Sequence, residues 1–150
     1  SPDLLGAIRL YLIFIAGTNL VWESAHMPLY TIWQTGTRSE IVFAAVHCTG
    51  GDILIAMSCL IGSLCLLGNK NWPTESFWPV ALLTVLTGLA YTIFSEWLNI
   101  EVRGAWAYGD WMPVIPIIGA GLSPFLQWIV LPIAGFVLVV RGQTKPRPAS

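Results

Sequence analysis

The chain has 150 residues, of which 55% are hydrophobic and 10% charged, and its mean hydropathy is +0.70. Soluble domains carry about 25% charged residues, so this composition excludes both a water-soluble globule and a disordered chain. The formal net charge of −1 and the lack of a basic block exclude nucleic acid as a partner. A membrane-spanning helix needs about 20 apolar residues, and the sequence has four such runs. We therefore expect a single all-α domain over residues 1–150, an integral membrane bundle of four transmembrane helices.

The first predicted span covers residues 4–26. This run is apolar except for Arg9 near its start, and Pro28 stops it just after the polar residues Glu23 and His26. Proline has no backbone N–H and cannot continue a helix. The two polar side chains are therefore expected at the end of the helix, near one surface of the bilayer.

The second predicted span covers residues 41–67. Thr37 and Glu40 precede it with the spacing of a capping box, and Gly68 follows it as a stop signal. This helix is longer than a bilayer core requires. Either its first two turns stand above the membrane, or it bends at the glycine pair 50–51.

The third predicted span covers residues 77–98, with Pro79 in its first turn, where a missing N–H costs little. The segment 100–111 that follows is expected to form a lid at the membrane surface. The fourth predicted span covers residues 114–140, but prolines and glycines interrupt it. We expect a short broken segment packed over a cavity and then a main helix from about Ser123, because broken backbone inside a bilayer needs protein or water partners.

Lysine and arginine are unevenly divided between the two predicted sides of the membrane. The side with both termini carries Arg9, Lys70, Arg141, Lys145 and Arg147, and the other side carries Arg38 and Arg103. Positively charged loops stay in the cytoplasm, so both termini are expected there. The short loops, which leave no folded domain outside the spans, favour a bacterial inner membrane.

Polar residues gather at the extracytoplasmic level of three predicted spans. They are Asn19, Glu23, His26, His47, Asp52, Ser95 and Glu96. An ionised side chain inside a bilayer costs at least about 2.5–3.5 kcal/mol, so several carboxylates at one depth are expected to face a shared cavity. For His26 and His47, an ordinary interfacial position is the alternative.

This cavity predicts a binding site for a hydrophobic small molecule or lipid, with no cofactor. Glu23, Asp52 and His26 are the expected acid–base groups, and Glu23 is also suited to pair with an ammonium group. The expected ligand-binding residues are Asn19, Trp22, Tyr91, Glu96 and Trp128.

Two alternatives stay open. Glu23 and His26 have the Glu-x-x-His spacing of dinuclear carboxylate bundles, and with His47 and Asp52 they form a candidate site for a metal ion or haem. His47 and Asp52 are about 140° apart on an ideal helix, so this site requires a distorted helix. In the other alternative, the chain is a non-catalytic accessory subunit of a larger membrane complex, or a homodimer, and partner helices satisfy its polar groups.

Several short segments resemble the EXPERA superfamily, which includes the eukaryotic sterol Δ8–Δ7 isomerase (emopamil-binding protein) and related sterol-binding or drug-binding membrane proteins. They are GTNLVWESAHMPLY at 17–30, Gly51 with Asp52, GLAYTIFSE at 88–96 and WIVLP at 128–132. The resemblance covers nearly the whole chain. It implies a four-span fold and a pocket for a sterol, isoprenoid or lipid.

The resemblance also implies residue roles. Glu23 matches the first-helix glutamate of the isomerase, and Trp128 matches the aromatic residue that faces a cationic intermediate or drug. Asn19 stands where the isomerase has a histidine, and Cys59 stands where its second-helix glutamate falls. Isomerisation needs two positioned acid–base groups. The resemblance therefore implies binding, and it implies isomerisation only if a neighbouring acid or histidine acts together with Glu23.

Overall fold

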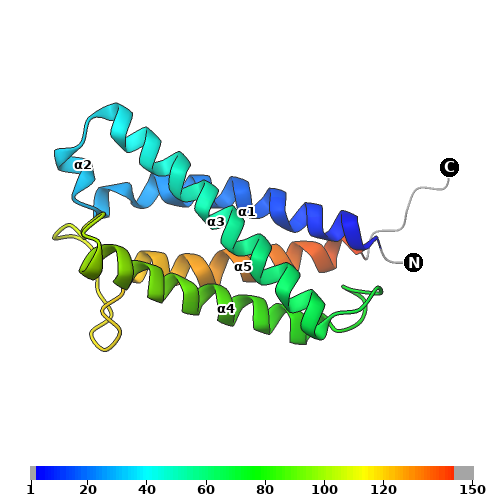
Figure 1. The fold of residues 1–150 in the computed structure, drawn as a ribbon. Helices are drawn as coiled ribbons and strands as arrows, with labels where there is room; N and C mark the ends of the chain where they lie inside the picture. The colour runs from blue at the N-terminus through cyan, green and yellow to red at the C-terminus, as the bar shows by residue number, and fades with distance from the viewer. Residues whose placement is uncertain (1–2, 144–150) are drawn as a thin grey trace.

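The structure, a computed structural model, describes residues 3–143, and the regular elements in this range are helices (Figure 1). The four long helices are α1 (Leu4–His26), α3 (Arg38–Leu67), α4 (Phe77–Trp97) and α5 (Leu122–Gln143). The short elements are η1 (Met27–Leu29), α2 (Ile32–Thr35) and the π-helical turn η2 (Leu98–Val102). The predicted all-α four-helix bundle is confirmed, and each long helix is apolar enough to cross a membrane.

The four long helices form a closed arrangement in which α1 and α4 each pack against both α3 and α5. The start of α1, the end of α5 and the turn between α3 and α4 lie at one end of the bundle (Figure 1). At this end Tyr11 stacks on Phe136 with 4.7 Å between ring centroids, and Trp72 meets Phe136 edge-on. Aromatic packing therefore closes this end, and α2 and the loop after α4 lie at the other end.

The predicted capping box opens α3. The backbone N–H of Thr37 donates to Glu40 Oε2 at 2.7 Å, and the backbone N–H of Glu40 donates to Thr37 Oγ1 at 3.3 Å. The helix then continues without interruption through the glycine pair 50–51 and ends before Gly68. The capping signal therefore gave the correct start of a helix that is longer than a bilayer core.

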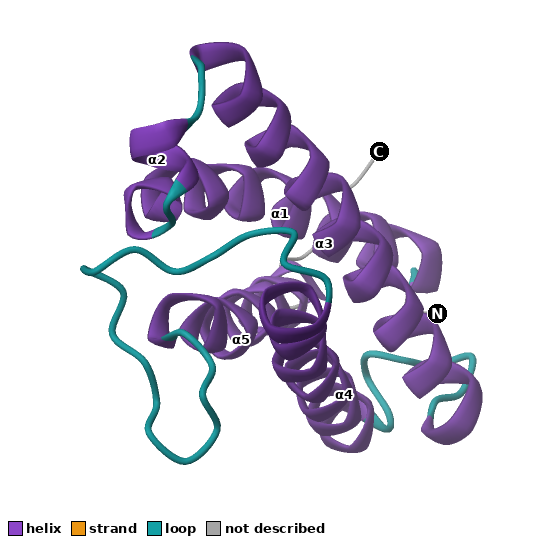
Figure 2. Cartoon of the chain, turned by 60° about the vertical axis from the view of Figure 1, so that its left-hand side comes forward, coloured by secondary structure: helices purple, strands orange, loops and turns teal. Residues whose placement is uncertain are grey.

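The fourth predicted span, over residues 114–140, is broken at its beginning as expected, and its main helix α5 starts at Leu122, one residue before the predicted Ser123. Pro113 and Pro116 supply no backbone N–H, so a helix through this segment would lose hydrogen bonds. Gly119 has a φ of 71°, which is left-handed and interrupts any right-handed helix. Residues 103–121 form an irregular loop, called the lid loop below, that crosses the end of the bundle between α2 and α5 (Figure 2).

Two features shape α5 below this loop. Pro132 lies inside the helix without ending it, and it leaves the carbonyl of Trp128, four residues earlier, without its usual helical donor. Nearer the end of α5, Gly135 lies directly against Tyr11, where an added Cβ would be 3.0 Å from the ring. The close approach of α1 and α5 at this level therefore depends on glycine.

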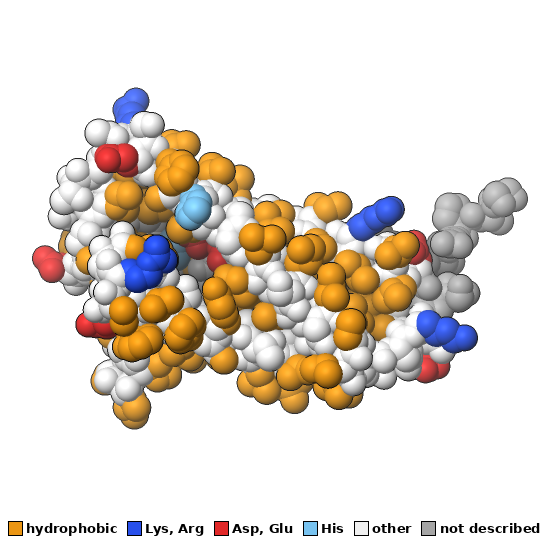
Figure 3. Space-filling model, in the orientation of Figure 1, with side chains coloured by type: hydrophobic (Ala, Val, Ile, Leu, Met, Phe, Trp, Pro, Cys, Tyr) orange, Lys and Arg blue, Asp and Glu red, His pale blue; other side chains and the backbone are white. Residues whose placement is uncertain are grey.

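On the face shown in Figure 3, hydrophobic side chains are spread along the length of the long helices. Large apolar side chains such as those of Ile13, Val42 and Leu66 are exposed, which suits a hydrocarbon environment. The basic residues divide as expected, with Arg9, Lys70 and Arg141 near the closed end and Arg38 and Arg103 near the lid loop. Lys145 and Arg147 lie outside the described residues. The chain is an integral membrane protein.

Candidate functional site

A cavity of about 820 Å³ opens at the end of the bundle that carries the lid loop. Its walls come from α1, α3, α4, α5 and the loops between them. The structure brings Glu23, Asp52 and Glu96 together in the lining of this one cavity, as the sequence predicts. Figure 3 shows the hollow at this end, with acidic side chains visible inside it. We call it the carboxylate cavity.

The amide of Gln127 on α5 connects the polar residues of α1 and α3. Its Nε2 atom lies 2.7 Å from Asn19 Oδ1, 2.9 Å from Glu23 Oε1 and 3.2 Å from Asp52 Oδ2. All four side chains are buried. Asn19 thus serves the site indirectly, because its amide oxygen binds Gln127 and its Nδ2 donates to the Ile15 carbonyl.

The three acceptors around Gln127 outnumber the hydrogens available to them. A side-chain amide nitrogen carries two hydrogens, whereas three oxygens lie within bonding distance of Gln127 Nε2. Because an acceptor left unpaired in a buried site is costly, a further proton or a donor group is favoured between Glu23 and Asp52. The arrangement can therefore hold a proton or pair with a ligand that carries donors.

His26 lies at the edge of the same network. Its Nε2 atom is 3.2 Å from Glu23 Oε2, and its Nδ1 atom is 2.8 Å from Ser123 Oγ. Glu23 is thus held from both sides, by Gln127 through Oε1 and by His26 through Oε2. These contacts fix the carboxylate and the imidazole relative to each other.

Glu96 is held by the lid loop and not by the Gln127 network. Tyr108 Oη donates to Glu96 Oε2 at 2.6 Å, and Tyr30 Oη donates to the same oxygen at 3.3 Å. The backbone N–H of Gly121 in turn donates to Tyr108 Oη at 2.8 Å. Burial raises the pKa of both Tyr30 and Tyr108, and the nearby Glu96 raises it further. Both hydroxyls therefore remain donors well into the alkaline range.

Backbone hydrogen bonds fasten the lid loop to the segment after α1. The N–H of Thr31 donates to the Ala107 carbonyl at 3.0 Å, and the N–H of Gly109 donates to the Leu29 carbonyl at 2.8 Å. Gly109 suits the second contact, since an added Cβ there would lie 3.2 Å from the Leu29 oxygen and would push the two segments slightly apart. The expected lid is therefore present, and it closes over the carboxylate cavity from the side of Tyr30.

Aromatic side chains form much of the remaining wall. Tyr91 and Trp128, both predicted as ligand-binding residues, line the carboxylate cavity. Trp128 packs on α4 at Gly88, where an added Cβ would be 2.9 Å from the indole ring. Trp106 of the lid loop also lines the cavity, and its buried Nε1 atom has no hydrogen-bond partner among the described residues.

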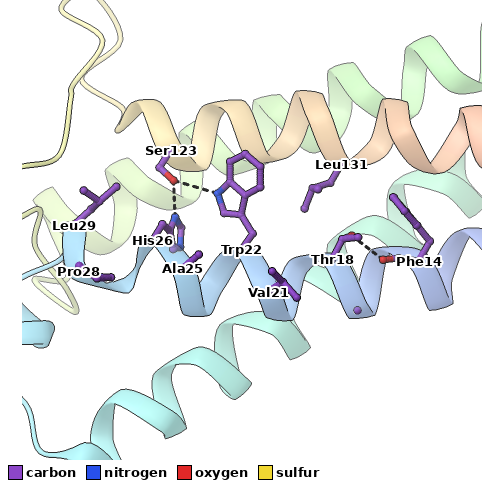
Figure 4. Close-up of a pocket in the computed structure, with 11 residues that line it drawn as sticks. Phe14, Thr18, Val21, Trp22, Ala25, His26, Pro28, Leu29, Ser123 and Leu131 are labelled. Atoms are coloured by element: carbon purple, nitrogen blue, oxygen red, sulfur yellow. Dashed lines mark hydrogen bonds between the residues drawn. The ribbon is translucent and has the colours of Figure 1, made fainter.

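The predicted placement of Trp22 is wrong. Its side chain lines a second cavity, of about 780 Å³, on the other side of His26 between α1 and α5 (Figure 4). We call this cavity the α1/α5 groove. The helical position of Trp22, next to Glu23, rotates it away from the carboxylate cavity by about 100°. His26 is the one residue in the range 3–143 that lines both cavities.

The alternative metal site does not form. Within residues 3–143, no group of three or more His, Cys, Asp or Glu side chains is arranged to hold a metal ion. His47 is exposed at the rim of the carboxylate cavity, where its ring stacks on Phe43 with 5.3 Å between centroids. Both ring nitrogens of His26 are already hydrogen-bonded, so neither faces a haem iron.

Comparison with protein-family models, with curated proteins and with solved structures gives no match. Four residues of the polar networks were not predicted from the sequence, namely Tyr30, Tyr108, Ser123 and Gln127. Gln127 had a detectable signal, because it is an isolated amide inside the apolar segment FLQWIVLP. The two tyrosines had none, since their role depends on how the lid loop meets α1.

Proposed function

We propose that the protein binds a hydrophobic small molecule, such as a sterol, isoprenoid or lipid, in the carboxylate cavity. The observation that carries this proposal is the presence of Glu23, Asp52 and Glu96 in one cavity whose other walls are largely apolar and aromatic. Apolar clefts with a few placed polar groups are typical of ligand sites. The unpartnered N–H of Trp106 supports it, because buried donors normally have partners.

The chemistry of the cavity favours a ligand that carries positive charge or hydrogen-bond donors near one end. The oxygens of Asn19, Glu23 and Asp52 around Gln127 Nε2 are one acceptor more than its two hydrogens can serve. The face of Trp128 attracts a cation by about 0.5–2 kcal/mol. This preference agrees with the resemblance to EXPERA proteins, in which Glu23 and Trp128 occupy matching positions.

We also propose that the protein isomerises the molecule that it binds. It needs one group that protonates a carbon and another that removes a proton. Glu23 and Asp52 are joined through Gln127, and His26 contacts Glu23 directly. These groups replace the histidine and the glutamate that the resemblance expects at Asn19 and Cys59.

The binding proposal is tested on the protein purified in a mild detergent. Molecules extracted from it are compared by mass spectrometry with the bulk lipid of the same membranes. We expect one class of hydrophobic molecule to be enriched, and Glu23→Gln to reduce that enrichment at least fivefold. Glu75→Gln is the matched control, because Glu75 is exposed at the closed end of the bundle.

Two results contradict the proposal. The first is extracted material that matches bulk lipid in both the wild type and Glu23→Gln. The second is a stable set of co-purifying membrane proteins with no enriched small molecule, which indicates an accessory subunit. If the enriched molecule contains a carbon–carbon double bond, incorporation of deuterium from heavy water tests whether the protein isomerises it.

We also propose that both termini are cytoplasmic, in a bacterial inner membrane, and that the carboxylate cavity opens on the opposite side. Arg9, Lys70 and Arg141 at the closed end of the bundle support this orientation. A reporter that is active only outside the cytoplasm should be inactive when fused after the last residue and active when inserted near Gly104. The reverse pattern contradicts the orientation.

A further inference from the structure

The α1/α5 groove has almost wholly apolar walls, and the polar side chains of His26 and Ser123 lie together at one end. Figure 4 shows Phe14 and Leu131 at one end of the groove and Ser123, His26 and Pro28 at the other. The α1 segment from Phe14 to His26 spans about 18 Å at a rise of about 1.5 Å per residue. The groove therefore suits a long hydrocarbon chain with its polar end beside the Ser123 hydroxyl.

Two side chains contact the Ser123 hydroxyl, and a third contacts one of these two. His26 Nδ1 lies 2.8 Å from Ser123 Oγ, and the Trp22 indole N–H donates to the same oxygen at 3.1 Å. The other imidazole nitrogen, Nε2, lies 3.2 Å from Glu23 Oε2. The network thus runs from the indole to the hydroxyl, then to the imidazole, and ends at the carboxylate.

One assignment of hydrogens satisfies every contact in this network. Trp22 can only donate and an ionised Glu23 can only accept, so the proton of a neutral His26 is placed on Nε2, facing Glu23. Nδ1 then accepts from the Ser123 hydroxyl. This tautomer is assigned from the hydrogen-bond network. It gives a hydroxyl, a base within reach of its proton, and a carboxylate that orients the base.

These three roles define an activated nucleophile. Ser123 lies in the first turn of α5, a helix of 22 residues, and the N-terminal end of a helix dipole stabilises negative charge. The Trp22 N–H is positioned to stabilise the same charge on Ser123 Oγ.

We propose that Ser123, His26 and Glu23 form a catalytic triad that hydrolyses an acyl ester whose hydrocarbon chain lies in the α1/α5 groove. This activity is separate from ligand binding in the carboxylate cavity, although the two sites meet at His26. Fatty acyl esters fit because the groove is apolar along its length and the hydroxyl lies at its end.

The reaction has two steps. Ser123 Oγ attacks the carbonyl carbon of the ester while His26 accepts the hydroxyl proton, and the carbon–oxygen bond to the alcohol breaks as His26 passes that proton to the alcohol. Water from the nearby membrane surface then attacks the acyl-serine, again with His26 as the base. The second step releases the fatty acid and restores the Ser123 hydroxyl.

The test uses the whole chain in detergent and a fluorophosphonate that carries a long alkyl chain. This probe forms a covalent bond with activated serine hydroxyls. We expect the label on Ser123, located by mass spectrometry of peptides, and no label on that peptide in Ser123→Ala. His26→Gln and Glu23→Gln should each slow labelling at least tenfold. Nitrophenyl palmitate should be hydrolysed faster than nitrophenyl acetate, and only with Ser123 present.

Two controls test whether the labelling is specific to the triad. Ser24→Ala removes an exposed hydroxyl of α1 that donates to the Leu20 carbonyl, and Glu75→Gln alters an exposed carboxylate at the closed end of the bundle. Neither should change the labelling of Ser123. Absence of label on Ser123 in the wild type overturns the proposal. Equal labelling in His26→Gln also overturns it, since the serine then needs no base.

Discussion

Glu23 on α1 accepts a hydrogen bond from Gln127 on α5, with 2.9 Å between Oε1 and Nε2. The other oxygen of the same carboxylate contacts His26. One side chain therefore joins the interior of the carboxylate cavity to the wall of the α1/α5 groove. Because both oxygens are engaged, the carboxylate is held in one orientation by residues from two helices.

Replacing Gln127 with leucine should destabilise the bundle. The substitution leaves the oxygens of Asn19, Glu23 and Asp52 without their shared donor, and each unpaired buried group costs about 1–3 kcal/mol. We expect a loss of at least about 2 kcal/mol in the free energy of unfolding, measured by denaturation in detergent. Gln34→Leu, at an exposed position of α2, is the control. Equal stability of the two variants would show that the network contributes nothing.

Tyr108→Phe should loosen the lid loop without unfolding the bundle. It removes the donor to Glu96 and the acceptor for the Gly121 N–H. A hydrogen bond to a charged group contributes about 1.5–3 kcal/mol. Amide hydrogen exchange across residues 104–121 should therefore become at least tenfold faster, while exchange in α4 stays unchanged. Tyr91→Phe is the matched control, and equal exchange rates in both variants would exclude a fastening role for Tyr108.

The Tyr108 contact should persist in alkaline solution. Burial and the adjacent Glu96 raise the pKa of Tyr108 above the ordinary tyrosine value of about 10. Because the folded state favours the neutral hydroxyl, the stabilisation is fully present below the pKa of an unfolded tyrosine and is lost as pH rises through the folded value. Spectroscopic titration to about pH 10.5 should give the same tyrosinate absorbance for the wild type and Tyr108→Phe. A smaller signal in the variant would contradict the raised pKa.

Gly88→Ala should disturb the wall of the carboxylate cavity. The added Cβ would lie 2.9 Å from the Trp128 indole, so the ring must move, and such overpacking typically costs about 1–3 kcal/mol. Gly62→Ala places a Cβ in open space on α3 and should be neutral or stabilising by up to about 1 kcal/mol. Unfolding measurements on the two variants check this, and a neutral Gly88→Ala would mean that Trp128 can shift freely.

The sequence predicted the helix ends well where they are set by contacts between residues that are close in the chain. The capping box of Thr37 and Glu40 and the stop at Gly68 depend on residues within one turn of each other, and all are present in the structure. The gathering of Glu23, Asp52 and Glu96 was also predictable, because the cost of charge in a bilayer restricts where carboxylates can point.

The parts of the site that the sequence did not predict depend on contacts between segments that are far apart in the chain. Nothing near Gln127 in the sequence indicates that its amide meets Asn19 and Asp52, since that follows from the rotation of α5 against α1 and α3. The pairing of Tyr30 with Tyr108 likewise requires the path of the lid loop. Trp22 was misplaced for the same reason, because a helix presents neighbouring residues to different partners.

Pro132 makes α5 easier to bend at a position close to the indole of Trp128. The carbonyl of Trp128 has no helical donor opposite it, so α5 bends more easily at this level than elsewhere along its length. The segment of α5 before Pro132 carries Ser123, which lines the α1/α5 groove, and Gln127 and Trp128, which line the carboxylate cavity. A molecule that enters either cavity can therefore be accommodated by a small bend of α5 at Pro132. The tightly packed contact of Gly135 with Tyr11, which lies after the proline, is not affected by this bend.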